Sequence, residues 1–145
     1  MKIYLDFDGT VVEHYFPEIG AENPHAIQVI ARLQAVGHDI VLNTYRADID
    51  QKHVQEALDF IHSLDVLAYP IEKFLPKKLE PRAFDLKVAQ ESNQLYIDDI
   101  AEGIPMRRNI VLESGMMVDW IELEKILEEA GFFESAQENL KLKPI

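Results

Sequence analysis

Carboxylates stand at two places in the sequence, and each place directly follows an apolar run. The first is the segment Asp6-Phe7-Asp8-Gly9-Thr10, and the second is the pair Asp98-Asp99. Two carboxylates about 4 Å apart repel each other by roughly 1 to 4 kcal/mol, so a cluster needs a proton or a hard cation to offset the repulsion. Mg²⁺ suits a site made of one or two carboxylates, water and a substrate phosphate. We therefore expect Mg²⁺ chemistry if the two places meet in space.

Alternation along a strand sends Asp6 and Asp8 to one side and Phe7 to the other. Gly9 allows the backbone to turn or to approach a ligand closely. Each aspartate pair alone is more often an ordinary strand end or turn. The two pairs together with the hydroxyl of Thr44, at the end of another apolar run, indicate one functional site.

The elements that must position these residues alternate between strand and helix. Strands are expected at 2–6, 39–44, 66–69, 94–99 and 109–112, and a loop at 72–81. Helices are expected at 23–37, where Asn23-Pro24 is typical of a helix start, through Val54 to Ile61 with Asp48 or Asp50 as cap, through Phe84 and Val88, and at 119–131. This order predicts an α/β domain with a doubly wound, mainly parallel sheet covered on both faces. Ligands bind such sheets at the carboxyl ends of the strands, where the acidic residues stand.

Length and charge narrow the choice of function. The 145 residues allow one domain, expected at 1–131 with a tail at 132–145. Acidic residues number 26 and Lys plus Arg number 14, so the net charge is −12, which disfavours binding to nucleic acid or to a membrane surface. The chain has no cysteine, no signal-peptide pattern at its start and no membrane-spanning apolar run, so a cytoplasmic location is expected.

The motifs resemble those of the haloacid-dehalogenase superfamily of aspartate-nucleophile phosphohydrolases. Asp6-Phe7-Asp8-Gly9-Thr10 resembles its first motif, Thr44 its second and Ile97-Asp98-Asp99 its acidic fourth. The chain is also similar to small bacterial members of unassigned substrate, which share Val12-Glu13-His14 and an Asp119-Trp120 helix start. The resemblance implies the Rossmann-like fold of that superfamily.

The resemblance also implies roles. Asp6 would be the nucleophile that forms an aspartyl-phosphate, and Asp8 the general acid and then the general base. Mg²⁺ would be held by Asp6, by the backbone carbonyl of Asp8, and by Asp98 or Asp99. Thr44 would donate a hydrogen bond to the phosphate. Gly9 and Thr10, at the end of the first motif, are expected against the substrate.

A lysine that neutralises the phosphate is expected in the basic stretch 73–87. Lys78 is favoured because Lys78-Leu79-Glu80-Pro81-Arg82-Ala83-Phe84 is similar to a common form of the third motif. Lys87 is the alternative, since it stands nearer to Asp98 in the sequence.

Two more side chains are candidates for contact with the substrate. Arg46 could clamp a second anionic group of the substrate or form a surface ion pair with Asp48. His14 belongs to the segment that overhangs the site in the resembling family. The intervals between Thr10 and Thr44 and between Thr44 and Lys78 are too short for a separate cap domain, so the site is expected to be open unless an oligomer partner covers it.

The sequence therefore predicts a Mg²⁺-dependent phosphomonoester hydrolase acting on a small phosphorylated metabolite. One alternative is a receiver-like phosphoacceptor, which the order of the motifs disfavours. Another is a catalytically inactive scaffold that keeps the metal site. The sequence contains neither of the glycine-rich loops that bind nucleotide phosphates in the common nucleotide folds.

Overall fold

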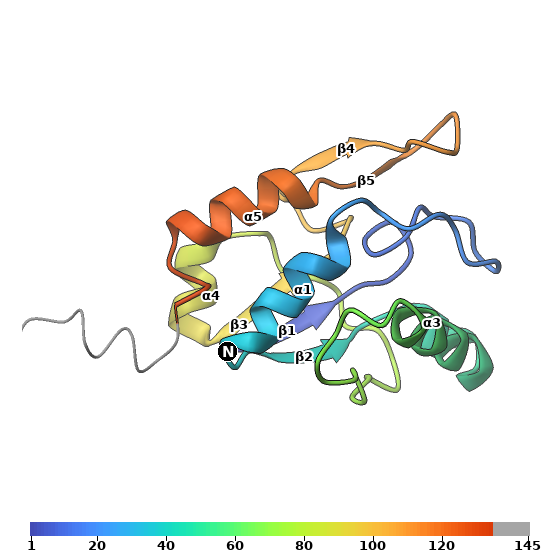
Figure 1. Ribbon diagram of the computed structural model, residues 1–145, viewed down its shortest axis with the longest axis horizontal. Coiled ribbons are helices and arrows are strands. Elements are labelled where there is room, and N and C mark those ends of the chain that lie inside the picture. Colours follow the sequence, from blue (N-terminus) through green and yellow to red (C-terminus); the bar gives the residue numbers. More distant parts are fainter. Residues whose placement is uncertain (135–145) are drawn as a thin grey trace, which may run out of the picture.

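The computed structural model describes residues 1–134, and its helices and strands form a mixed α/β fold (Figure 1). In chain order the elements are β1 (Lys2–Leu5), α1 (Ala26–Ala35), β2 (Asp39–Leu42), α2 (Arg46–Ile49), α3 (Gln51–Ser63), α4 (Leu86–Ser92), β3 (Gln94–Ile97), β4 (Met106–Arg108), β5 (Met116–Val118) and α5 (Trp120–Glu129). Within residues 1–134, no helix has the length and apolar character that crossing a membrane would require.

A three-stranded parallel sheet in the order β2-β1-β3 lies at the centre (Figure 1). Leu5 at the end of β1 is in register with Leu42 of β2 and Ile97 of β3. All three strands therefore end at the same edge of the sheet. The residues that follow them, Asp6, Asn43 and Asp98, emerge side by side.

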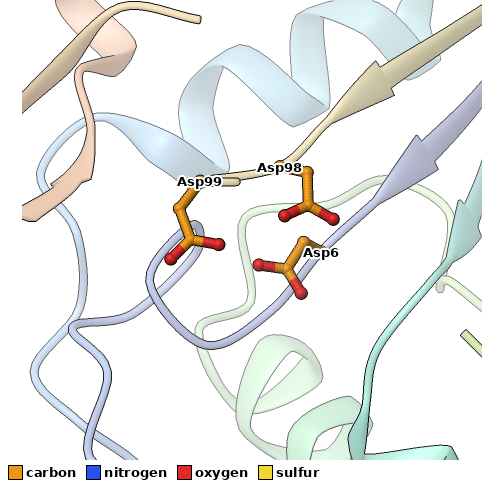
Figure 2. Close-up of side chains that lie close together, drawn as sticks. All are labelled: Asp6, Asp98 and Asp99. Atoms are coloured by element: carbon orange, nitrogen blue, oxygen red, sulfur yellow. The ribbon is translucent and has the colours of Figure 1, made fainter. Parts of the chain in front are cut away.

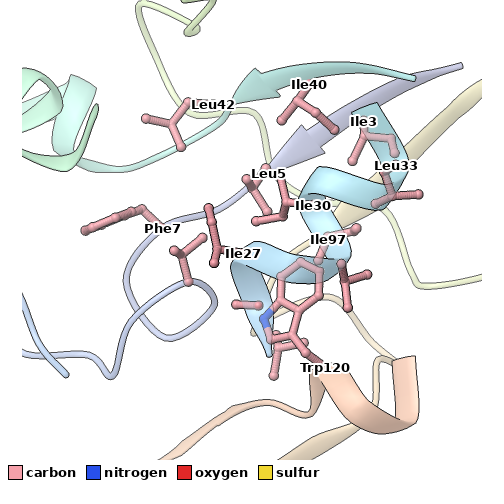
Figure 3. Packing of buried hydrophobic residues seen from close by; sticks show 14 of the residues in the cluster. Ile3, Leu5, Phe7, Ile27, Ile30, Leu33, Ile40, Leu42, Ile97 and Trp120 are labelled. Carbon is pink, nitrogen blue, oxygen red and sulfur yellow. The ribbon is translucent and has the colours of Figure 1, made fainter. Parts of the chain in front are cut away.

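The main hydrophobic core lies on one face of this sheet (Figure 3). Ile3 and Leu5 of β1 face Ile27 and Ile30 of α1, and burial of each such side chain contributes roughly 1.5–3 kcal/mol. Trp120 at the start of α5 is fully buried, and its indole N–H donates a 2.7 Å hydrogen bond to the backbone carbonyl of Thr10. This bond ties α5 to the loop that follows β1.

The opposite face of the sheet carries a smaller cluster. Tyr4 and Tyr96 stack with 4.8 Å between their ring centroids, and Val41 lies beside them. Leu75, from the segment between α3 and α4, packs against the three side chains. Among the described residues, this cluster contains no helical residue, so the segment containing Leu75 takes the place of the helix layer expected on this face.

The strand expected at 66–69 is not formed. Val66 and Tyr69 are 41% and 66% exposed, so these side chains gain little of the packing that stabilises a strand. The sheet edge is met instead by Phe74, in a single parallel bridge to Leu42. Leu42 donates its backbone N–H to the carbonyl of Lys73 at 2.9 Å and accepts one from Leu75 at 2.9 Å.

The strand expected at 109–112 is also wrong. This segment lies in the turn between β4 and β5, which form a separate antiparallel pair. The backbone N–H groups of Ile110, Val111 and Leu112 donate to the carboxylate of Glu13 at 3.2, 2.8 and 2.8 Å. Because these three N–H groups point to one carboxylate, they cannot also donate to a neighbouring strand.

Of three residues expected at helix starts, two cap their helices in the structure. Asp50 caps α3 and Asp119 caps α5, as expected. Asn23 does not cap α1, because its side-chain N–H₂ group donates to the carbonyls of Thr10 (2.8 Å) and Val118 (2.7 Å). Asn23 is fully buried and joins the first loop to β5.

The first two residues of the tail expected at 132–145 pack with the core. Phe132 is 4% exposed and belongs to the main core, and Phe133 packs against the core. Residues 135–145 of the expected tail lie outside the described residues.

Glu13 offers a test of how the β4–β5 turn is held. Burial raises the pKa of this carboxyl group, but the three backbone N–H donors together outweigh burial and hold the pKa below its usual value of 4.5. We expect Glu13→Gln to reduce the free energy of unfolding at pH 7 by about 1–3 kcal/mol, measured by urea denaturation.

The folded state lowers the pKa of Glu13, so its contribution is complete above pH 4.5 and is lost as the pH falls through the lower folded value. The difference between the wild type and Glu13→Gln should therefore narrow in acid. Glu91→Gln, on the exposed surface of α4, is the matched control. A constant difference across this pH range would contradict the assignment.

Candidate functional site

Three carboxylates meet where β1 and β3 end (Figure 2). Asp6, Asp98 and Asp99 each contribute one oxygen to a group in which all three atoms lie within 4.8 Å of one another. The register of the sheet produces this arrangement, because Asp6 donates its backbone N–H to the carbonyl of Ile97 at 3.0 Å. Asp6 and Asp98 are 4% and 1% exposed. The two acidic segments of the sequence thus form one buried cluster.

Gly9 and Thr10 hold these carboxylates in place. Gly9 has φ +83°, and a Cβ atom there would collide with the carboxylate of Asp99. The Thr10 hydroxyl donates to Asp6 Oδ2 at 2.8 Å and accepts from the backbone N–H of Asp99 at 3.1 Å. Thr10 is completely buried, so its expected contact with the substrate is wrong: both hydrogen bonds of its hydroxyl group are made within the protein. Gly9 is likewise buried, and what lies against it is Asp99.

Lys78 is the cation at the centre of the cluster. Its ammonium group donates to Asp6 Oδ1 at 2.9 Å and lies 2.7 Å from Asp98 Oδ2, and its side chain is 2% exposed. Lys87, the alternative lysine, is exposed on α4 and does not line the cavity at this site. Of the two lysines, the structure brings only Lys78 to the carboxylates.

Sequence reasoning missed the residue that holds Lys78 in place. Asn43 accepts the backbone N–H of Leu79 at 2.9 Å and donates to the carbonyl of Leu79 at 3.0 Å. Asp48 accepts the backbone N–H of Lys78 at 3.2 Å. The signal was a buried amide directly after the apolar run of β2, where a side chain can bond to a neighbouring loop.

Burial and mutual repulsion set the electrostatics of the cluster. Burial raises the pKa of Asp6 well above its ordinary value, the charge of Asp98 raises it further, and Lys78 opposes both. Burial is also the largest cause that raises the pKa of Asp99, to about 6. Burial lowers the pKa of Lys78, but the Asp6 and Asp98 carboxylates outweigh it and raise the value. Lys78 therefore remains an ammonium, one positive charge against three carboxyl groups.

The donor set fits a hard divalent cation. Asp98 Oδ2 is buried, and none of the described residues directs an aligned hydrogen bond at it, although Lys78 lies beside it as an ion pair. The ligand atoms offered by Asp6, Asp98 and Asp99 are all carboxylate oxygens, which Mg²⁺ prefers. The side chain of Asp8 lies outside this group.

Asp8 instead forms a two-point ion pair with Arg46. Arg46 Nε donates to Asp8 Oδ2 and Nη2 donates to Asp8 Oδ1, both at 2.8 Å. Its other N–H groups donate to the carbonyls of Glu18 (2.9 Å), Pro17 (3.4 Å) and His53 (3.5 Å). All five guanidinium donors are thus occupied.

The two expectations for Arg46 are both wrong. Its side chain is completely buried and its partner is Asp8, so it forms no surface pair with Asp48. Because no guanidinium donor remains free, Arg46 also cannot clamp a second anionic group of a substrate. Its planar fork fixes the orientation of Asp8.

A cavity of about 440 Å³ opens above the cluster. Its walls are formed by Asp6, Asp8, His14, Phe16, Thr44, Tyr45, Arg46, Asp48, Ile49, Lys78, Asp99 and Ile100. Thr44 and His14, both expected at the site, therefore line it. Thr44 is almost completely buried, and its hydroxyl oxygen accepts the backbone N–H of Arg46 at 3.1 Å.

The apolar members of the cavity wall were not predicted. Phe16, Ile49 and Ile100 lie in loops or in the short helix α2, where the sequence shows no periodicity that would mark them. Only the folded chain brings these three segments together. Within residues 1–134, no inserted domain separates the cavity from solvent.

No family model and no curated protein matches the sequence. The chain is similar to a conserved protein from Bacteroides thetaiotaomicron whose structure has been solved. The two are 25% identical, with a TM-score of 0.55, and the match covers 90% of this chain and 91% of the other. This likeness supports the α/β fold over nearly the whole chain and names no activity.

The carboxylate cluster makes a direct prediction about metal binding. We expect Asp98→Asn and Asp99→Asn each to weaken Mg²⁺ binding by at least about tenfold, because each removes one anionic oxygen ligand. Isothermal titration calorimetry measures the affinity. Asp65→Asn, at an exposed position away from the cavity, should bind Mg²⁺ like the wild type. Unchanged affinity in both cluster variants would rule out this metal site.

Proposed function

We propose that the protein is a Mg²⁺-dependent phosphomonoester hydrolase that acts through an aspartyl-phosphate intermediate. The observation that carries the proposal is the environment of Asp6. Its carboxylate lies at the floor of the cavity, with Lys78 on one oxygen and Thr10 on the other, while Asp8 lines the same cavity. This arrangement supports the haloacid-dehalogenase-like roles that the motifs imply.

In the first step, an oxygen of Asp6 attacks the phosphorus atom of the bound ester. The new bond joins this oxygen to phosphorus, and the bond between phosphorus and the ester oxygen breaks. Asp8 gives its proton to the leaving oxygen, so the alcohol departs neutral. The ammonium of Lys78 and the hydroxyl of Thr44, which line the cavity, would stabilise the charge on the phosphate oxygens.

In the second step, Asp8 takes a proton from a water molecule, and the water oxygen attacks phosphorus. The bond between phosphorus and Asp6 breaks, inorganic phosphate leaves, and both aspartates return to their starting states. When bound, Mg²⁺ held by Asp6, Asp98 and Asp99 would neutralise the anionic nucleophile and the phosphate together.

The pair between Asp8 and Arg46 imposes a condition on this mechanism. Each oxygen of Asp8 accepts one hydrogen bond from Arg46, so proton exchange with the substrate must use the second lone pair of an oxygen that faces the cavity. If the pair held the carboxylate of Asp8 away from the bound phosphate, the second step would have no base and the aspartyl-phosphate would accumulate. This is the one observation that favours the phosphoacceptor alternative, and turnover separates the two readings.

Phosphate release tests the proposal directly. We expect repeated turnover of phosphomonoesters with Mg²⁺, loss of turnover with a chelator, and loss of at least about 10³-fold in Asp6→Asn, which removes the nucleophile. A single equivalent of phosphate transferred and retained on the wild-type protein would instead identify a phosphoacceptor. Mg²⁺ binding without any transfer would identify a scaffold.

The two lysines provide a matched pair of variants. Lys78→Met should lower kcat/KM by about 10²-fold or more, because a charged donor to the transition state is lost, whereas Lys87→Met should be close to the wild type. Stabilisation of Lys78→Met by Mg²⁺ in thermal unfolding would show that the variant folds and keeps its carboxylate cluster. Equal losses in both variants would contradict the role given to Lys78.

A further inference from the structure

We infer that the cavity accepts phosphate esters whose leaving group is uncharged and apolar where it adjoins the phosphate. This inference rests on the proposed phosphomonoesterase function and names the class of substrate for the same cavity. It excludes substrates that carry a second phosphate or a carboxylate close to the ester, such as bisphosphates and phosphorylated small acids.

The first argument is the absence of a free cation in the cavity wall. Among the described residues that line it, the permanent cations are Arg46 and Lys78. Arg46 has all five donors occupied, and Lys78 is paired with two carboxylates of the cluster. Lys78 can serve the phosphate that is cleaved, but neither cation remains for a second anion. Desolvating an unpaired anion there would be costly.

The second argument is that an aromatic ring of the cavity wall packs against each of these two cations. The guanidinium carbon of Arg46 lies 5.0 Å from the ring centre of Phe16, and the ammonium of Lys78 lies 4.6 Å from that of Tyr45. Each ring therefore presents one face to a buried cation and leaves other atoms exposed, with Phe16 37% and Tyr45 47% exposed. Ile49 and Ile100, at 60% and 53% exposure, extend the apolar wall.

The third argument is the sign of the charges at the mouth. Asp48 lines the cavity, and Glu80 accepts a 2.7 Å hydrogen bond from the hydroxyl of Tyr45. Lys77 is exposed and directly precedes Lys78 in the sequence. It lines a separate hollow with Asp48 rather than this cavity. His14 is the remaining titratable side chain that can carry positive charge in the wall. The cavity wall thus combines apolar surface with the carboxylate of Asp48, and the carboxylate of Glu80 lies next to Tyr45; both repel an anionic leaving group.

Matched pairs of esters test the inference. Benzyl phosphate and methyl phosphate both release a primary alcohol, so their comparison reports the apolar contact. Phenyl phosphate and 3-carboxyphenyl phosphate differ by one anion with little change in the leaving oxygen. We expect kcat/KM to favour benzyl over methyl, and phenyl over its carboxylate, each by about tenfold or more.

A charge-introducing variant should reverse one of these preferences. Ile49→Lys places an ammonium in the apolar wall and should reduce the phenyl over 3-carboxyphenyl ratio by about tenfold, since the carboxylate gains a partner. Ile121→Lys makes the same change at an exposed position of α5 outside the cavity and should leave the ratio unchanged. Because the readout is a ratio, a general loss of folded protein cancels.

The failure of this inference differs from the failure of the proposed function. Turnover with no preference within either pair, or with phosphocholine preferred to benzyl phosphate, would overturn the inference and leave the hydrolase intact. If no ester is turned over, calorimetry with Mg²⁺ and the uncleavable benzylphosphonate and methylphosphonate decides. Tighter binding of benzylphosphonate by tenfold would support the apolar wall without hydrolysis, and equal binding would overturn it.

Discussion

Electrostatic repulsion among Asp6, Asp98 and Asp99 is the constraint around which the rest of the site is arranged. The parallel register of β1 and β3 forces two of these carboxylates together, and burial removes the water that would screen them. A domain stabilised by only about 5–15 kcal/mol carries such repulsion at a cost in stability. The protein offsets part of it with one ammonium, that of Lys78. Under the proposed function, the repulsion that remains would favour the binding of a hard cation.

Placement of that single ammonium explains several otherwise separate features of the fold. Lys78 comes from a segment without helix or strand, and this segment is fixed by side chains next to β2 rather than by a ladder of its own. The same segment supplies Leu75, which covers Tyr4 and Tyr96 on the second face of the sheet. One stretch of chain thus closes the core and delivers the cation. A strand at 66–69 would have paired with the same sheet edge but would not have carried Lys78 to the site.

The sequence predicted those parts of the site that depend on local pattern and strand order. Asp6 and Asp98 follow apolar strands, and parallel packing suffices to bring them together. The partner of Arg46 could not be predicted, because its choice of Asp8 over Asp48 depends on how the loop after β1 folds back over α3. The hairpin of β4 and β5 was misplaced for a related reason. Ile110 and Val111 have strand propensity, but the distant carboxylate of Glu13 takes their N–H groups.

The two aspartates of the first motif, Asp6 and Asp8, have different partners. Asp6 faces Lys78 and the other carboxylates, whereas Asp8 is held by a guanidinium that is itself enclosed between Phe7 and Phe16. Under the proposed function, Phe16 has two contacts: its ring packs against Arg46, and it forms part of the apolar wall that would meet the leaving group. An apolar leaving group resting on this wall would exclude water from the floor of a cavity that has no inserted lid among the described residues. Excluding water strengthens every charge interaction beneath it, so the substrate itself would supply the low-dielectric cover that a cap domain supplies in larger enzymes.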